Sequence, residues 1–180
     1  MTVTVLSPRI ALFCFGTALG SQISLFTTLN HSLFSRITHL EILESIADNE
    51  WDRWSGLAVI PQLTHVSFNG FGARHIFKRV LDSCRSLQAM VVLFMSRHTM
   101  DLHASADNIG SLAQEPRFIV TICPKYETDW QVGAWGGDDY WRRADILINK
   151  RKSGEIDRLT YVLEGPAMAE DLVDLGSDAH

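Results

Sequence analysis

The chain has 180 residues, of which 46% are hydrophobic and 21% are charged. These proportions suit one globular domain and exclude a wholly disordered chain. The net charge is -5, but five of the 21 acids lie in a C-terminal stretch without Lys or Arg, so the rest of the chain is neutral. A neutral body argues against nucleic acid as a partner, because binding to phosphates needs clustered excess Lys and Arg.

The first apolar segment, Ile10 to Leu19, has two interpretations. It has the length of the apolar region of a signal peptide, and it also suits a buried strand. Pro8 before it and Gly16 within it favour the strand. No apolar run reaches the roughly 18 to 20 residues that a membrane-spanning helix needs, so we expect no membrane partner.

Three later segments repeat the pattern L-x-x-L-x-L with conservative replacements. They begin at Ile37, Leu63 and Leu87, so their starts are 26 and 24 residues apart. Leucine-rich repeats use periods of roughly 20 to 29 residues. A weaker copy begins at Ile10, and a further strand is expected over residues 117–122.

Between these strands the apolar spacing changes to that of helices. The clearest predicted helix covers residues 73–84, with a short one after Asp48 and a weaker one over 105–114. Strands that are joined by helices lie parallel. We therefore predict an α/β fold: a short leucine-rich-repeat-like solenoid with a parallel sheet over residues 1–123. An ordinary small α/β sheet is the alternative.

The C-terminal third has a different composition, with clustered aromatic residues and glycines. We expect residues 124–160 to form an aromatic and helical cap, with a helix over about 138–152 that ends before Gly154. Residues 161–180 carry only negative charge and are predicted to be a mobile acidic tail. Residues 90–95 and 118–120 are apolar at every position, as in parallel strands covered on both faces. Cap tryptophans should therefore cover these strands: Trp130, Trp135 or Trp141 over Val91, Leu93 or Ile119.

At these residues the chain resembles the leucine-rich-repeat part of F-box-like proteins that are numerous in mushroom-forming fungi. The resemblance covers roughly residues 30 to 156 and rests on the segments 37–42, 60–66, 115–120, 136–145 and 151–156, with Trp130. It implies a horseshoe-like array that recognises a protein, sometimes behind an F-box that docks on a ubiquitin-ligase adaptor. No leucine- and proline-rich F-box helix precedes the repeats here, so adaptor docking is not expected.

Candidate catalytic and metal-binding patterns are weak. His98 and His103 miss the i, i+4 spacing that places two ligands on one helix face. Gly70-x-Gly72 lies between a strand and a helix but lacks the rest of a phosphate-binding loop. Asp138 and Asp139 are explained by a helix N-terminus, which favours acids. We therefore expect no catalytic residue, no metal site and no cofactor.

The three cysteines are far apart and form no C-x-x-C pair, which removes zinc and disulfide frameworks and indicates a reducing compartment, the cytoplasm or nucleus. Cys123, before Pro124, has no identifiable base beside it and is interpreted as a buried small hydrophobe.

The predicted partner site lies on the strand face opposite the core. Because alternate side chains of a strand face opposite ways, the equivalent positions of the first two repeats would form an exposed ladder. Its members are His39, Glu41, His65, Ser67 and Asn69. We therefore expect a non-catalytic module that binds an unidentified protein through this face. The alternative is a small α/β enzyme or ligand-binding domain with its site at the C-terminal strand ends.

Overall fold

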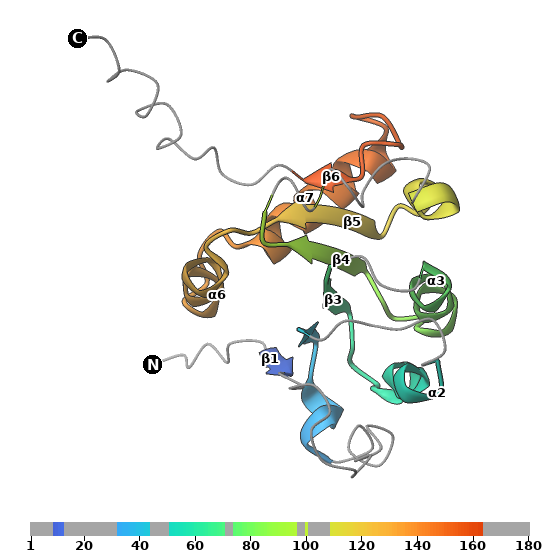
Figure 1. Ribbon diagram of the computed structural model, residues 1–180, viewed down its shortest axis with the longest axis vertical. Helices are drawn as coiled ribbons and strands as arrows, with labels where there is room; N and C mark the ends of the chain where they lie inside the picture. The colour runs from blue at the N-terminus through green and yellow to red at the C-terminus, as the bar shows by residue number, and fades with distance from the viewer. Residues whose placement is uncertain are drawn as a thin grey trace, which may run out of the picture.

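The computed structural model describes residues 9–12, 32–43, 51–70, 74–96, 100 and 109–163. Within these residues, six strands form one parallel sheet whose strand order follows the chain (Figure 1). The predicted α/β class with a parallel sheet is confirmed. The strands are β1 (Arg9–Leu12), β2 (His39–Ile42), β3 (His65–Asn69), β4 (Ala89–Phe94), β5 (Phe118–Ile122) and β6 (Val162–Leu163).

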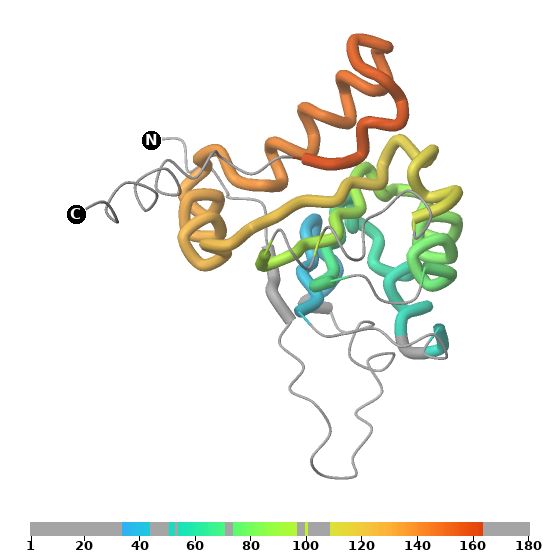
Figure 2. Tube along the Cα trace, turned by 45° about the horizontal axis from the view of Figure 1, so that its top comes forward, coloured from blue at the N-terminus to red at the C-terminus, as the bar shows by residue number. Residues whose placement is uncertain are grey.

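Helical segments lie on both faces of the sheet. On one face the structure places η1 (Ser32–Arg36), α2 (Trp51–Trp54), η2 (Ser55–Val59), α3 (Arg74–Ser83) and η3 (Gly110–Gln114). On the other face are α6 (Tyr126–Ala134) and α7 (Tyr140–Ser153). Figure 2 shows α7, in orange, apart from α3, in green, with β5, in yellow, between them.

The register of the strands matches the alignment of the three repeated segments. Leu40 pairs with Val66, and Val66 pairs with Met90. One backbone hydrogen-bond pattern also recurs at the start of successive strands. The carbonyl of Thr38 accepts hydrogen bonds from the amides of Thr64 and His65, each at 2.9 Å. The carbonyl of Thr64 accepts in the same way from the next strand, from residues 88 and 89 at 2.7 and 3.1 Å. The three segments therefore occupy equivalent places in the sheet.

The alternation of side chains divides the interior into two apolar clusters. Leu40, Val66 and Met90 point to the face covered by α3, as expected for the core positions of the repeat. Val91 and Ile119 point to the face covered by α6 and α7, in one cluster with Trp141. One of the predicted tryptophan contacts is thus confirmed. Trp130 packs partly buried against the same cluster, whereas Trp135 is exposed.

Two predicted helices form close to their expected bounds. The apolar side of α3 is buried as predicted, through Ile76, Phe77, Val80 and Leu81. The predicted helix over 138–152 is α7, which begins after Asp139, whose carboxylate accepts from the amide of Arg142 at 2.9 Å. It ends at Gly154, which has a φ of +76°.

Other expectations need correction or lie outside the described residues. The segment 126–134 forms α6, a helix that was not predicted from the sequence. The predicted tail began at residue 161, but residues 162 and 163 form β6 against β5. Residues 13–31, 101–108 and 164–180 lie outside the described part, and with them most of the alternative signal segment and the rest of the tail. In the described part, the helices are too short or too polar to span a membrane.

Candidate functional site

The structure brings the five predicted partner-binding residues together on β2 and β3. His39 pairs with His65, and Glu41 pairs with Ser67. The expectation that the ladder faces solvent is wrong for three members, because Glu41, His65 and Ser67 are only 2%, 5% and 0% exposed. Helices α6 and α7 cover this face over the early strands as well as the late ones. His39 and Asn69 remain half-buried.

Glu41 is the centre of a buried polar network. Its carboxylate accepts from the phenol of Tyr126, from the phenol of Tyr140 at 2.6 Å and from the indole Nε1 of Trp141 at 3.0 Å. Tyr140 Oη and Ser67 Oγ share a further hydrogen bond of 3.2 Å. A buried charge is tolerated only when such donors replace its water shell. The network therefore ties β2 and β3 to both cap helices.

The two ladder histidines form a second part of this interface. The His39 and His65 rings are stacked with their centroids 4.1 Å apart, and both meet the Trp141 ring edge to face. Nε2 of His65 lies 3.0 Å from a carboxylate oxygen of Asp145 on α7. Nδ1 of His65 lies 2.8 Å from the hydroxyl of Thr64. Both ring nitrogens of His65 are thus engaged within the protein.

These environments favour a structural role for the network. Burial and the nearby carboxylate of Glu41 raise the pKa values of Tyr126 and Tyr140 well above that of free tyrosine. Both phenols therefore stay neutral donors at neutral pH rather than serving as bases. Burial also raises the pKa of Cys123 to about 12, which keeps this thiol protonated at neutral pH.

Neither α6 nor the two tyrosines that bind Glu41 was predicted from the sequence, although one signal pointed to them. In the sheet, Glu41 and Ser67 belong to one row with Val91 and Ile119. An acid in a row that continues with apolar residues can be buried if distant donors reach it. The sequence does not say which donors do so, because Tyr126 and Tyr140 lie 85 and 99 residues away.

The most exposed large apolar side chain among the described residues is Trp135, directly after α6. It is 88% exposed, and Val132, one turn earlier, is 41% exposed. The turn that follows is tightly built. A Cβ on Gly137 would lie 2.6 Å from Cγ1 of Val132 and 2.9 Å from its carbonyl oxygen, and Gly136 has a φ of +78°.

Hydrogen bonds of Asp129 hold this turn between α6 and α7. Its carboxylate accepts from the amide of Tyr140 at 2.8 Å and from the guanidinium of Arg143 at 2.7 Å. Arg143 also donates to the carbonyl of Asp138 at 2.8 Å. Trp135 is therefore presented to solvent by a fixed support rather than by a loose loop.

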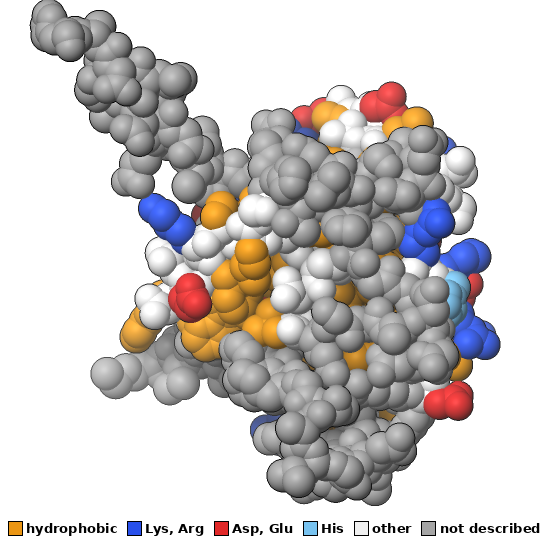
Figure 3. Space-filling model, viewed as in Figure 1, with side chains coloured by type: hydrophobic (Ala, Val, Ile, Leu, Met, Phe, Trp, Pro, Cys, Tyr) orange, Lys and Arg blue, Asp and Glu red, His pale blue; other side chains and the backbone are white. Residues whose placement is uncertain are grey.

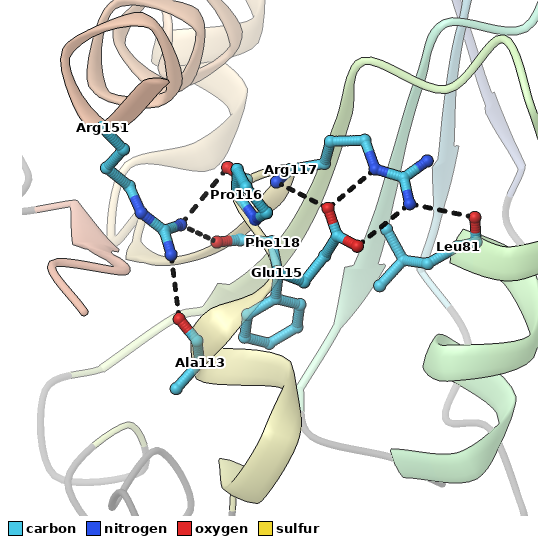
Figure 4. Close-up of polar contacts among 7 residues, drawn as sticks. All are labelled: Leu81, Ala113, Glu115, Pro116, Arg117, Phe118 and Arg151. Atoms are coloured by element: carbon cyan, nitrogen blue, oxygen red, sulfur yellow. Dashed lines mark hydrogen bonds and ion pairs between the residues drawn. The ribbon is translucent and has the colours of Figure 1, made fainter. Parts of the chain in front are cut away.

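A groove of about 230 Å³ opens between α3 and η3 on the other face of the sheet. Arg117 fixes its walls, because its guanidinium donates to the carbonyl of Leu81 at 3.1 Å and to both carboxylate oxygens of Glu115 at 2.8 and 3.0 Å (Figure 4). The residues that line the groove are Lys78, Leu81, Asp82, Ser111, Leu112, Gln114, Glu115 and Pro116.

Arg151 lies near this region with a buried guanidinium that acts as a cross-link. It donates to the carbonyls of Phe118 at 2.9 Å, Ala113 at 2.8 Å and Arg158 at 2.8 Å (Figure 4 shows the first two). All of these acceptors are backbone groups. Arg151 therefore links three segments of the chain to one another: η3, β5 and the segment after α7.

Metal ligands do not gather in the described part of the chain: no three His, Cys, Asp or Glu side chains are placed there to hold an ion. Comparison with protein-family models, curated proteins and solved structures gave no match.

Proposed function

We propose that the chain is a non-catalytic protein-recognition module that binds its partner through the surface around Trp135. The observation that carries this proposal is the 88% exposure of this indole next to the half-exposed Val132. Tryptophan is among the residues that contribute most to binding energy at protein interfaces. A partner would receive the indole in an apolar pocket.

The fixed turn behind Trp135 supports this proposal. Binding is weakened by the entropy lost when an exposed side chain or loop becomes ordered. Here the hydrogen bond from the amide of Gly137 to the carbonyl of Val132, at 2.9 Å, and the bonds of Asp129 have already ordered the support. Less entropy is therefore lost when a partner binds.

A leucine-rich-repeat-like solenoid is the architecture we propose for the β2–β4 part. The equivalent register of the three segments and the repeated backbone bonds at Thr38 and Thr64 support this. The chain would then be related to the substrate-recognition parts of F-box-like proteins. In that case this chain would bind its partner through the cap, around Trp135, because the cap covers the sheet face that would otherwise be the recognition surface.

Affinity capture with quantitative mass spectrometry tests the recognition surface. The wild-type chain, Trp135→Ala and Val59→Ala are compared as baits in lysate from the source organism. Val59 is the matched control, since it is 56% exposed in η2, on the face of the sheet away from α6. We expect at least one protein that wild type and Val59→Ala retain and Trp135→Ala loses by tenfold or more.

The melting temperature of each variant must equal that of wild type, so that a loss of binding is not caused by unfolding. If all three baits retain the same proteins in the same amounts, the proposal is wrong. A small molecule that co-purifies with wild type and Trp135→Ala alike would instead favour the ligand-binding alternative.

A further inference from the structure

We propose that the contact of His65 with Asp145 is a pH-sensitive switch in the attachment of the cap, in which a second proton on the imidazole ring turns a hydrogen bond into an ion pair. His65 lies on β3 and Asp145 on α7, so the contact joins the sheet to a helix that covers it. This inference goes beyond the recognition surface around Trp135 and does not depend on it.

The hydrogen bonds of His65 determine which ring nitrogen is protonated when the ring is neutral. An ionised carboxylate can only accept, so Nε2, which lies 3.0 Å from Oδ1 of Asp145, carries the proton. The other nitrogen, Nδ1, is then an acceptor, and the hydroxyl of Thr64 donates to it at 2.8 Å. Both nitrogens of the neutral ring are therefore paired.

The same hydroxyl of Thr64 also pairs the charged ring. It has one proton and a second acceptor within reach, the carbonyl oxygen of Thr38 at 3.1 Å. When Nδ1 of His65 gains a proton, it donates to the oxygen of this hydroxyl, and the hydroxyl proton turns to the carbonyl of Thr38. In the neutral state that carbonyl still accepts from two backbone amides at 2.9 Å. Rotation of one hydroxyl therefore leaves the ring fully paired in both protonation states.

The charged groups around His65 favour one added proton. Asp145 supplies the opposite charge from α7, and the buried Glu41 adds a second carboxylate on β2. The ring of His39 is stacked on that of His65 at 4.1 Å, Arg9 pairs with His39 from β1, and the neighbour of His65 on β4 is an alanine. Two positive rings at this separation repel each other. The stacked pair should therefore take up one proton, on the ring that faces Asp145.

This arrangement sets the direction of the pH dependence. Protonation of a buried histidine is ordinarily unfavourable, because the charged ring loses its water. His65 is 5% exposed, but the carboxylate of Asp145 and the hydroxyl of Thr64 replace that water. A histidine of the unfolded chain titrates at about pH 6.5, so the stability that the ion pair contributes is present below this pH and is lost as the pH rises.

Urea unfolding of the full chain at about pH 5.5 and about pH 8 tests the switch. Asp145→Asn removes the negative charge and keeps a side chain of similar shape. We expect it to raise the unfolding equilibrium constant about threefold more at the lower pH, a modest effect because the side chain of Asp145 is 44% exposed and water screens the pair. Glu155→Gln is the matched control. Its partner at 2.9 Å is a lysine, Lys150, and lysines stay charged over this range, so its effect should be equal at the two pH values.

Two further measurements assign the effect to His65. In His65→Gln, the effect of Asp145→Asn should be equal at the two pH values, because no titrating ring faces the carboxylate. Proton–nitrogen NMR spectra of the histidine rings in the full chain should show the proton of His65 on Nε2 at about pH 8, and a proton on each nitrogen at about pH 5.5. His75 on α3 is the reference for a histidine in contact with water. It is exposed, and Figure 3 shows histidine surface, in pale blue, among Lys and Arg side chains on the side where α3 lies.

Equal effects of Asp145→Asn at the two pH values overturn the inference, as does a neutral ring whose proton lies on Nδ1. A pH-dependent effect of Asp145→Asn that persists in His65→Gln assigns the dependence to another group and also overturns it. These measurements use no partner protein. Failure of the switch and failure of recognition through Trp135 are therefore distinguishable.

Discussion

The phenol of Tyr140 donates a 2.6 Å hydrogen bond to the carboxylate of Glu41, which lies 99 residues earlier in the chain. This contact connects an early strand of the sheet to the first residue of α7. Removing the acceptor should therefore weaken the attachment of the whole cap.

Glu41→Ala is expected to lower the free energy of unfolding by about 3 to 5 kcal/mol, the loss typical when one partner of a buried charged interaction is removed, because three buried donors then lack an acceptor. Glu41→Gln should lose less, since its amide oxygen still accepts. Urea titration followed by tryptophan fluorescence measures both. Glu155→Gln is the control at an exposed acid. A loss below about 1 kcal/mol for Glu41→Ala would show that water replaces the carboxylate.

Stability should fall steeply in alkali. Burial, with the hydrogen bonds to Glu41, raises the folded-state pKa values of Tyr126 and Tyr140, and burial raises those of Cys84 and Cys123 to about 11 and 12. In the unfolded chain the thiols lose their protons near pH 9 and the phenols near pH 10, at lower pH than in the folded protein. The free energy of unfolding that these groups contribute is therefore fully present below pH 9 and is lost as the pH rises above that value.

The alkaline loss can be measured by urea unfolding between pH 8 and pH 11, together with phenolate absorbance. We expect phenolate from Tyr126 and Tyr140 to appear only as the protein unfolds. The double variant Tyr126→Phe, Tyr140→Phe should have lower stability at pH 8 but a shallower decline above pH 10. Phenolate that forms below pH 10 in the folded protein would contradict this.

The central strands of the sheet were predictable from the sequence because their signals are local, whereas β6 lies where a tail was predicted. The spacing of Ile37, Leu63 and Leu87 gave the correct register, and the run from Met90 to Met95 indicated a strand covered on both faces. The extent of the cap was not predictable, because Glu41 and Ser67 are polar and their burial depends on donors from distant segments. Residue type also did not separate Trp141, which is buried, from Trp135, which is exposed.

Arg151→Lys is expected to lower the free energy of unfolding by about 2 to 4 kcal/mol. A lysine ammonium cannot reach the separate carbonyls of Ala113, Phe118 and Arg158 from one position, and each buried carbonyl left without a donor costs about 1 to 3 kcal/mol. Thermal and urea unfolding measure the loss. Lys152→Ala, at the exposed neighbour, should change stability by less than about 0.5 kcal/mol. Equal losses in the two variants would contradict the cross-linking role of Arg151.

Gly137→Ala should destabilise the turn after α6 by about 1 to 3 kcal/mol, because the new Cβ would overlap Val132. Adding Val132→Ala removes the contact at Cγ1 but not that at the carbonyl oxygen, so it should restore only part of the loss. A double-mutant cycle measured by urea unfolding gives the coupling. Independent, additive effects of the two substitutions would show that the turn relaxes freely.

The buried carboxylate of Glu41 also bears on the protein during its synthesis. All three donors lie at residue 126 or later, so a nascent chain that ends earlier carries an uncompensated charge on this face of the sheet. Inward-pointing charges are one means by which sheets avoid pairing with other chains. We therefore expect Glu41 to disfavour the burial of this face of the unfinished sheet against another chain, until α6 and α7 supply the donors that allow the charge to be buried.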